Sequence, residues 1–312
     1  MILIIGGNGF IGSRLINYFE SFGVEYKYTS SKNLNSASSN FYNLDLSLNI
    51  QDLQKIDVRS MFNNVSSIIY LPSLNAQETI QNKELAKKVK IEGAKFCLQK
   101  SIEFGVKQFV NLSTCHVYGA KLHGEYGEDS PLNPANLYAE NHAIAEEEIY
   151  ELSNKEDINL ISLRLANGVG SPMTKFENCW MLVVNDLCKQ IITNKRMVLK
   201  SPKSIKRDFV PFSSVEDVLH RLTMDCKIKH ESVINLSSAK TISIHHIVNK
   251  IRNISSKVLN FTPEVVYENS ADIIEEDFKF NNEILIGKFD NISFNLDTEI
   301  ETLLINCKKW FS

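Results

Sequence analysis

The chain has 312 residues, 43% hydrophobic and 23% charged, which is the composition of an ordinary globular protein with one large or two smaller domains. Its formal net charge of −3 gives no electrostatic basis for binding nucleic acid or an anionic membrane. No apolar run is long enough to span a bilayer, and the N-terminus lacks the basic start of a signal peptide. Six cysteines without a C-x-x-C pair indicate neither a metal site nor disulfides, so we expect a cytoplasmic protein.

The first twelve residues contain the strongest pattern. Residues 2–5 are an apolar, β-branched run, typical of a strand buried on both faces, and glycines follow at once. Gly7, Gly9 and Gly12 fit G-x-G-x-x-G, while Gly6, Gly9 and Gly12 fit G-x-x-G-x-x-G equally well. A helical pattern begins after the glycines, so its N-terminal amides would face a pyrophosphate. We therefore predict a dinucleotide site rather than a turn that only packs a helix on a strand; its members here are Gly6, Gly9, Phe10, Ile11 and Gly12.

The residues at the end of the next predicted strand, 24–29, indicate whether the cofactor is NAD or NADP. An NAD site would place Asp or Glu at its end to hold the adenosine ribose, and none is present. Ser30, Ser31 and Lys32 could instead receive a ribose 2′-phosphate, although such residues also form ordinary polar turns. The pattern favours NADP and leaves NAD open.

Strands and helices alternate over the following residues. Short strands are expected around residues 41–46, 65–72 and 106–113, with a helix over 83–104. This alternation predicts an α/β fold, a doubly wound Rossmann-type parallel sheet with a smaller C-terminal substrate-binding lobe. Asp45 could accept a hydrogen bond from the adenine amino group, and further cofactor contacts are expected from Leu46, Leu71 and Pro72.

Polar side chains with catalytic potential follow the 106–113 strand. Thr114 falls just beyond its carboxyl end, where parallel sheets bind ligands. Residues 137–148 read as a helix on which Tyr138 and His142, four residues apart, share one face. A buried tyrosine–histidine pair with a purely structural role would have the same spacing.

Five motifs in register give the chain a resemblance to the extended short-chain dehydrogenase/reductases of the sugar-nucleotide epimerase/dehydratase family. They are the glycine loop, the Ser-Thr-x-x-Val-Tyr-Gly stretch at 113–119, Tyr138, the Arg-x-x-Asn stretch at 164–172, and Arg-Asp-Phe-Val at 207–210. The resemblance implies that Thr114 and Tyr138 are catalytic, with Tyr138 as acid and base. It implies that Asn167 and Arg207 contact the diphosphate of a nucleotide-sugar substrate. Relatives often dimerise through helices such as 83–104 and 137–153, so a homodimer is expected.

Two positions depart from the pattern that the family shows. His142 stands where relatives have the lysine of Tyr-x-x-x-Lys, and Lys90 stands where they have an asparagine. That lysine lowers the tyrosine pKa and holds the nicotinamide ribose. A neutral imidazole could donate one hydrogen bond to the ribose, while a protonated His142 could replace the lysine charge below a pKa of ~6.5. Lys90 could restore a cation nearby.

These features predict an enzyme that reduces a 4-keto sugar nucleotide. A less activated tyrosinate impairs oxidation more than reduction, because reduction starts from the neutral phenol. Dehydratase relatives carry Asp-Glu after the catalytic threonine, whereas Cys115 and His116 stand there in this chain. A 4-epimerase with tightly held cofactor is the alternative, and a catalytically silent NAD(P)-binding relative is a third.

The expected division places the dinucleotide-binding domain at residues 1–166. Residues 167–312 would mainly form the substrate-binding lobe, with a stretch near 205–225 returning to the first domain. Within that lobe, the spacing of apolar residues predicts a helix over 176–187 that contains Trp180.

Overall fold

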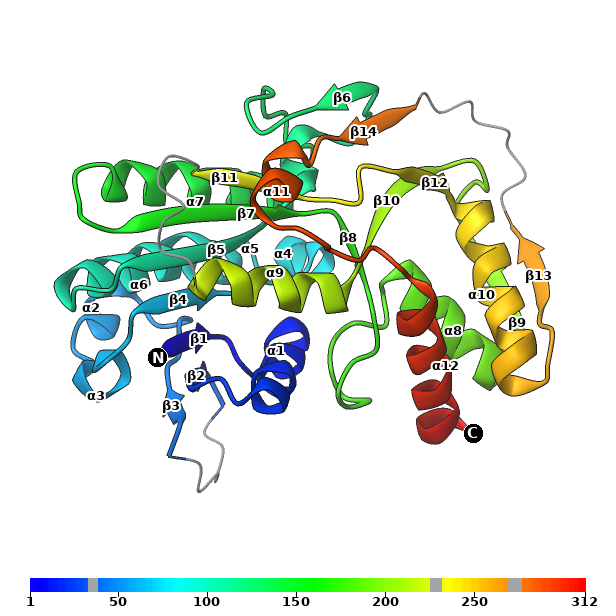
Figure 1. The fold of residues 1–312 in the computed structure, drawn as a ribbon, viewed down its shortest axis with the longest axis horizontal. Coiled ribbons are helices and arrows are strands. Elements are labelled where there is room, and N and C mark those ends of the chain that lie inside the picture. The colour runs from blue at the N-terminus through cyan, green and yellow to red at the C-terminus, as the bar shows by residue number, and fades with distance from the viewer. Residues whose placement is uncertain (33–38, 225–231, 269–276) are drawn as a thin grey trace. The chain divides into compact units, whose positions relative to one another are not determined.

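The computed structural model describes residues 1–32, 39–224, 232–268 and 277–312 (Figure 1). The chain forms two compact units. The first consists of Met1–Ala120, Glu128–Leu165 and Val218–Asn235, and the second of Lys121–Gly127, Ala166–Asp217 and Leu236–Ser312. Among the described residues, no helix is long and apolar enough to cross a membrane.

A seven-stranded sheet forms the centre of the first unit, in the order β11-β7-β5-β4-β1-β2-β3. Parallel pairing joins β3 to β2, β2 to β1, β1 to β4, β4 to β5 and β5 to β7. The chain winds outward in both directions from β1 and β4, which creates the crevice where such sheets bind ligands. This confirms the predicted Rossmann-type fold. The strands are β1 Ile2–Ile5, β2 Tyr26–Ser30, β3 Phe41–Asn43, β4 Ser67–Tyr70, β5 Gln108–Thr114, β7 Asn159–Leu165 and β11 Val233–Leu236.

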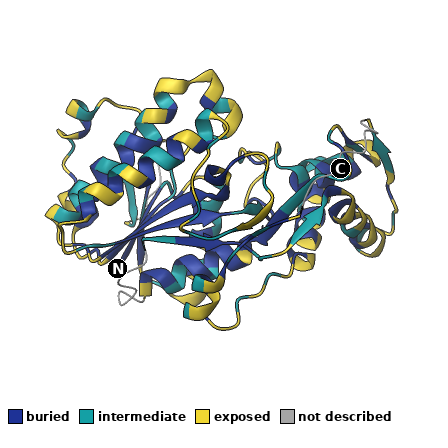
Figure 2. Ribbon diagram, turned by 90° about the horizontal axis from the view of Figure 1, so that it is seen from above, coloured by how far each residue is buried: buried dark blue, intermediate teal, exposed yellow. Residues whose placement is uncertain are grey.

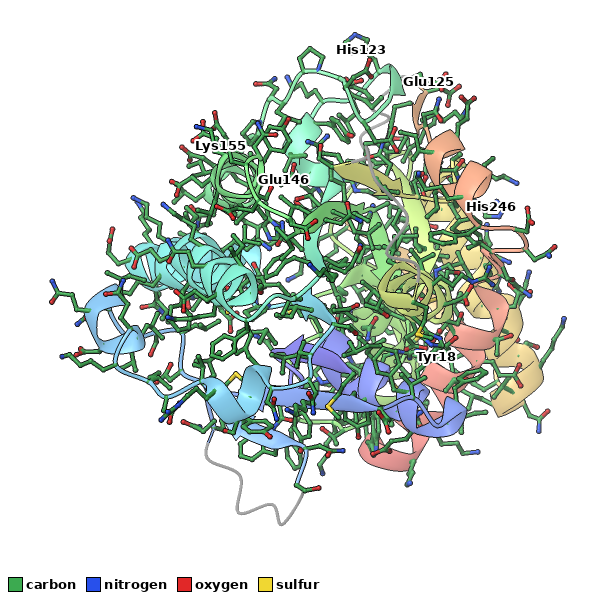
Figure 3. The ribbon with its side chains drawn as sticks, turned by 60° about the vertical axis from the view of Figure 1, so that its left-hand side comes forward. Tyr18, His123, Glu125, Glu146, Lys155 and His246 are labelled. Atoms are coloured by element: carbon green, nitrogen blue, oxygen red, sulfur yellow. The ribbon has the colours of Figure 1, made fainter. Side chains whose placement is uncertain are left out.

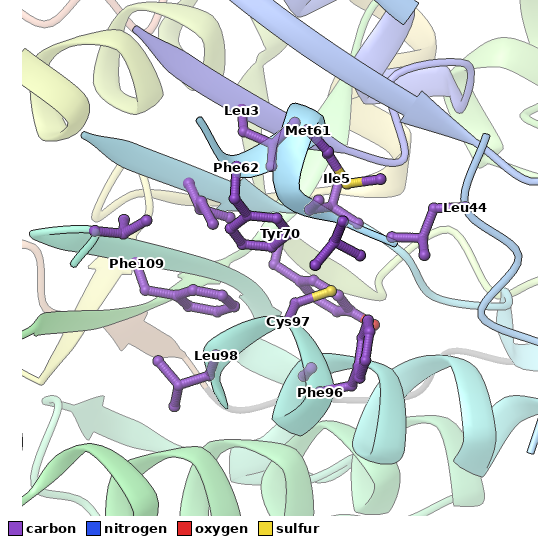
Figure 4. Packing of buried hydrophobic residues seen from close by; sticks show 14 of the residues in the cluster. Leu3, Ile5, Leu44, Met61, Phe62, Tyr70, Phe96, Cys97, Leu98 and Phe109 are labelled. Atoms are coloured by element: carbon purple, nitrogen blue, oxygen red, sulfur yellow. The ribbon is translucent and has the colours of Figure 1, made fainter. Parts of the chain in front are cut away.

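Helices cover both faces of this sheet, and the exposed residues lie on their outer surfaces (Figure 2). On one face, Leu3, Ile5 and Tyr70 of the strands pack against Phe96 and Leu98 of a helix in a continuous apolar core (Figure 4). On the other lie α1 and the end of α9, joined by an edge contact between rings. The helices are α1 Phe10–Phe22, α2 Ile50–Leu53, α3 Arg59–Phe62, α4 Ala76–Gln81, α5 Lys83–Lys87, α6 Gly93–Glu103, α7 Leu137–Ser153 and α9 Phe212–Met224.

The helix predicted over 83–104 contains a π-helical turn. The turn, η1, comprises Lys88–Glu92 and joins α5 to α6 without a break. A π-helical turn inserts one residue into the α-helical repeat, and such turns occur often at functional sites. Here Lys90 and Ile91 of the turn are buried.

The second unit has a separate core, formed by α8, α10 and α12 with β9. The predicted helix over 176–187 was wrong, because α8 begins only at Val183. The Glu177 side chain accepts hydrogen bonds from the amides of Met173 and Thr174, and the Trp180 indole donates to the Lys175 carbonyl. These bonds hold the preceding residues in turns. The elements are β6 Gly124–Tyr126, β8 Asn167–Val169, α8 Val183–Asn194, β9 Arg196–Leu199, β10 Lys206–Pro211, β12 Thr241–Ser243, α10 Ile244–Leu259, β13 Glu264–Tyr267, β14 Phe278–Phe280, α11 Glu283–Lys288 and α12 Asp297–Phe311.

Candidate active site

The glycine loop joins β1 to α1, and the fold itself requires three of its glycines. A Cβ on Gly7 would lie 2.7 Å from the Tyr28 Cβ. Gly6 has φ +84°, a conformation that favours glycine. A Cβ on Gly12 would lie 2.4 Å from the Gly6 carbonyl oxygen and 2.7 Å from the Gly7 backbone. The loop is fixed to β2 because the Gly7 amide donates to the Thr29 carbonyl over 2.8 Å.

Gly9 differs, because the fold does not require it to be glycine. Its φ of −76° suits any residue, and a Cβ there would meet only the Gly6 carbonyl oxygen at 3.4 Å, an ordinary contact. Gly9 is exposed and precedes Phe10 and Ile11 at the start of α1, where free amides and the helix dipole favour an anion. A Cβ would therefore fill space that remains open to a ligand, so the loop fits the pyrophosphate of a dinucleotide.

The end of β2 is polar and contains no carboxylate. Ser30 is buried, and its hydroxyl accepts a hydrogen bond from the Lys32 amide at 3.1 Å. Ser31 and Lys32 are exposed, and the Asn43 side chain donates to the carbonyls of Ser30 and Ser31. The segment is thus a turn held by side-chain hydrogen bonds, with two exposed polar side chains.

Four other predicted cofactor residues occupy different settings. Pro72, after β4, lies beside the glycine loop, since a Cβ on Gly6 would be 3.1 Å from its ring. The Leu71 amide donates to the carbonyl of the last β1 residue. Asp45 accepts a hydrogen bond from the Ser47 amide at 2.9 Å, whereas Leu46 packs in the apolar core.

Thr114, Tyr138 and His142 come together at the carboxyl end of β5. Thr114 ends that strand and caps a short 3₁₀ turn, η2 (Cys115–Tyr118), by accepting from the His116 amide at 3.2 Å. The hydroxyls of Thr114 and Tyr138 are hydrogen-bonded, and desolvation raises the pKa of Tyr138. The Tyr138 and His142 rings lie one helical turn apart on α7, with centroids separated by 4.6 Å. Because the pKa of Tyr138 is raised, its phenol keeps its proton at neutral pH.

His142 is buried and neutral. Its side chain is 3% exposed, and Nε2 lies 3.1 Å from the Ser73 hydroxyl, in the loop after β4. Desolvation, followed by the charges of Lys90 and His116, lowers the pKa of His142 well below its ordinary value. The protonated form considered from the sequence is therefore wrong for this histidine. Its Nδ1 is buried without a hydrogen-bond partner in the described part of the chain.

Lys90 is buried in the core of the first unit, which the sequence could not predict. Its ammonium donates to the Asn111 side-chain oxygen at 2.9 Å and to the Leu112 carbonyl at 2.7 Å. It also lies over the Tyr70 ring, 5.5 Å from the centroid. Desolvation lowers the pKa of Lys90 to about 7, and the Glu146 carboxylate opposes this shift.

A buried ion pair lies beside the carboxyl end of β5. Glu146 of α7, one turn beyond His142, points toward the strands (Figure 3) and pairs with Arg164 of β7, with Oε2 2.7 Å from Nη2. Glu146 also accepts a hydrogen bond from Ser113, and Arg164 donates to the Tyr118 hydroxyl at 2.8 Å. The spacing of 138, 142 and 146 is the sequence signal that could have revealed this residue.

Asn167 and Arg207 belong to the second unit, on the neighbouring strands β8 and β10. The Asn167 side chain donates to the Asp208 carbonyl at 2.9 Å, and Arg207 donates to the Lys206 carbonyl at 2.7 Å. Asp208 is fully buried, and desolvation raises its pKa to about 6 although Ser238 donates two hydrogen bonds to it. Among the described residues, no group of three or more His, Cys, Asp or Glu side chains could hold a metal ion.

Comparisons with known proteins agree with the fold. A family model described as the NAD dependent epimerase/dehydratase family matches residues 2–236. A Methanocaldococcus jannaschii protein, provisionally named UDP-glucose 4-epimerase, is 24% identical over 275 residues, covering 86% of this chain and 85% of that protein. The Brucella ovis UDP-glucose 4-epimerase in complex with NAD has a TM-score of 0.81 at 16% identity, covering 98% of both chains. MoeE5 in complex with UDP-glucuronic acid and NAD has a TM-score of 0.80 at 16% identity, covering 99% of both.

Proposed function

The chain belongs to the NAD dependent epimerase/dehydratase family, and we propose that it reduces a 4-keto sugar nucleotide with a nicotinamide cofactor. One observation supports this direction: Tyr138, hydrogen-bonded to Thr114, has a raised pKa and stands beside a neutral imidazole. A tyrosine that retains its proton is prepared to act as an acid, whereas oxidation requires tyrosinate at the start.

The reaction divides between the cofactor and two side chains. The nicotinamide, when bound, supplies a hydride to the keto carbon. Tyr138 donates its phenolic proton to the carbonyl oxygen, so that the product is an alcohol rather than an alkoxide and the tyrosine is left as tyrosinate. Thr114 orients the phenol and the carbonyl oxygen through its hydroxyl. Asn167 and Arg207 are proposed to contact the substrate diphosphate.

We further propose that NADPH is the preferred cofactor. The support is the end of β2, where Ser31 and Lys32 are exposed and no Asp or Glu occurs between Thr29 and Leu44. The solved structures of similar proteins described above contain NAD, so NADH is the competing cofactor in every assay. Cytoplasmic localisation and a homodimer are parts of the same proposal.

A second candidate is a 4-epimerase, favoured by the similarity to the M. jannaschii protein over most of both chains. An epimerase oxidises and then reduces its substrate within one cycle, so its cofactor is not consumed. The neutral environment of Tyr138 makes the oxidative half more difficult, which is why we place reduction first.

The deciding experiment supplies the purified protein with 4-keto sugar nucleotides and NADPH or NADH, and follows cofactor absorbance and products. Net oxidation of the cofactor with formation of the alcohol supports reduction. Interconversion of 4-epimers without net cofactor oxidation would replace it by epimerisation. Cofactor binding with neither reaction would indicate a silent relative. Tyr138→Phe should reduce kcat by ~10²–10⁴-fold and leave cofactor affinity nearly intact.

A further inference from the structure

Thr114 and Tyr138 come from different elements, so their hydroxyls meet only if β5 and α7 are held in register. Thr114 ends β5, whereas Tyr138 lies in the first turn of α7. A single hydrogen bond between hydroxyls leaves the relative position of the two backbone segments to other contacts. A misplacement of about 1 Å at reacting groups can lower a rate by ~10²-fold. The contacts that hold these two elements together therefore bear on the chemistry.

The Glu146 carboxylate fixes the residue that precedes Thr114. Glu146 lies on α7 two turns after Tyr138, about 12 Å along the helix axis. It accepts a hydrogen bond from the Ser113 hydroxyl, and both side chains are buried. This bond joins the end of β5 to the helix that carries Tyr138.

The Arg164 guanidinium fixes the other end of the same segment. The η2 turn begins after Thr114 and ends at Tyr118, whose hydroxyl accepts a hydrogen bond from Arg164 Nη1 at 2.8 Å. The guanidinium carbon also lies over the Tyr118 ring, 4.9 Å from its centroid. In addition, the Cys115 thiol donates to the Arg164 carbonyl over 3.1 Å. Thr114 thus lies between two anchored positions, Ser113 and Tyr118.

The two anchors are linked, because Glu146 and Arg164 form a bidentate ion pair. Arg164 Nη2 and Nε lie 2.7 and 3.0 Å from Glu146 Oε2, and Nε lies 3.3 Å from Oε1. Arg164 Nη1 also donates to the Glu128 carbonyl at 3.1 Å. The guanidinium is planar, so these partners together fix its orientation. The two side chains are 5% and 7% exposed, and a displacement of one is transmitted to the other.

Folding stability alone is a weak reason for a buried ion pair at this place. Removing two charges from water offsets most of their attraction, and an apolar pair of similar volume is often equally or more stable. An apolar pair could not make the directional hydrogen bonds to Ser113 and Tyr118. Those bonds are what the charges add here.

We propose that the Glu146–Arg164 pair positions the Thr114 hydroxyl for the proposed reduction. It acts through the bonds described above, without contact to the reacting atoms. A fixed Thr114 hydroxyl keeps Tyr138 directed at the carbonyl oxygen to which it donates its proton. The inference rests on the proposed function, because it takes these two hydroxyls to flank the reacting carbonyl.

The first test uses the ligand-free full-length protein and does not depend on activity. In protein labelled with ¹³C at the threonine methyl groups, Thr114→Ser identifies the Thr114 signal by its loss. Ser113→Ala and Tyr118→Phe each remove one anchor and leave the ion pair in place, and each should lower the order parameter of this methyl group. Ser101→Ala, which removes a buried hydroxyl on α6, should not. An order parameter equal to that of the wild type in either anchor variant would overturn the proposal.

The second test measures reduction of a 4-keto sugar nucleotide by the same variants with NADPH. Loss of an anchor should lower kcat about tenfold or more, while KM, cofactor Kd and Tm stay close to wild type. Tyr26→Phe removes a phenol hydroxyl that donates to Glu20 at 2.8 Å, and as the matched control for Tyr118→Phe it should keep wild-type kcat. A kcat that falls only in step with Tm, or falls equally in the control, would show a purely structural role and overturn the proposal.

Exchange of the whole pair separates positioning from stability. Glu146→Leu with Arg164→Met replaces both charges by apolar side chains, and such exchanges are often neutral for stability. In a double variant that melts like wild type, kcat should still fall about tenfold or more. Wild-type kcat in that folded variant would refute positioning by the pair. If the double variant does not fold, Ser113→Ala and Tyr118→Phe still decide, because they retain the pair.

The two hypotheses fail in different ways. A protein that reduces no 4-keto sugar nucleotide refutes the proposed function, and the catalytic meaning of the pair falls with it, whatever the methyl spectra show. A protein that reduces its substrate at the wild-type rate without either anchor refutes only the positioning of Thr114.

Discussion

The glycine loop allows a sharp comparison of two single-methyl substitutions, Gly9→Ala and Gly12→Ala. A Cβ on Gly12 would approach backbone atoms at 2.4 and 2.7 Å, and those atoms cannot move like the end of a flexible side chain. Overpacking of this kind costs about 1–3 kcal/mol of folding stability. On Gly9 the nearest atom would be 3.4 Å away, so no comparable strain arises.

For Gly9→Ala, small opposing terms leave the folding stability close to that of the wild type. Alanine is a poorer N-cap than glycine, which lowers the folding stability by up to about 1 kcal/mol. Alanine also reduces the conformational entropy of the unfolded chain, which raises the folding stability by about 0.4–1 kcal/mol. The methyl group would nevertheless occupy the approach of a pyrophosphate to the α1 amides. We expect Kd for NADPH to rise at least about tenfold, equivalent to ~1.4 kcal/mol.

Thermal melts and fluorescence titration of both variants check this reasoning. Gly12→Ala should lower Tm, whereas Gly9→Ala should melt like wild type and bind cofactor weakly. The argument would be refuted by a Gly9→Ala protein with wild-type affinity, because the space at Gly9 would then have no ligand. A Gly12→Ala protein with unchanged Tm would show that the loop backbone can relax.

Three further predictions address other parts of the chain. Lys32→Asp should weaken NADPH binding and spare NADH in paired titrations; equal losses would contradict the assigned 2′-phosphate contact. Glu146→Gln should destabilise by ~3–5 kcal/mol in urea unfolding, because it leaves Arg164 buried without its charge partner. Glu147→Gln, on the exposed side of the same helix, should be near neutral. Because the pKa of Asp208 is raised to about 6, the folded state binds that proton more tightly than the unfolded chain. As the pH rises from about 4 to 6, the free energy of unfolding should therefore fall by ~3 kcal/mol relative to that of Asp208→Asn. An equal pH dependence of the free energy of unfolding in the two proteins would contradict this.

Local patterns were sufficient to predict the elements that hold the site. The apolar run before Gly6 predicts β1, and the glycine spacing predicts the turn into α1, because both depend on neighbouring residues alone. Similarly, a four-residue spacing places Tyr138 and His142 on one face of α7 whatever the rest of the chain does.

The surroundings of His142 could not be predicted in this way. Ser73 comes from the loop after β4 and Lys90 from a π-helical turn, so their positions depend on contacts with residues far away in sequence. An α-helical periodicity carries no sign of the extra residue that η1 inserts. The burial of Lys90 against Asn111 arises only once β5 and the helix are packed together.

The first unit is discontinuous in sequence, which has a consequence for anyone who shortens the chain. A fragment that ends at residue 166 would lack β11, the strand that borders β7 in the sheet. It would also lose the carbonyl of Thr223 that accepts a hydrogen bond from Ser67 in β4. The exposed β7 edge could then pair with another copy. Such a fragment should aggregate. A fragment in which residues 218–235 are joined to it through a short linker should stay monomeric, because β11 would again pair with β7.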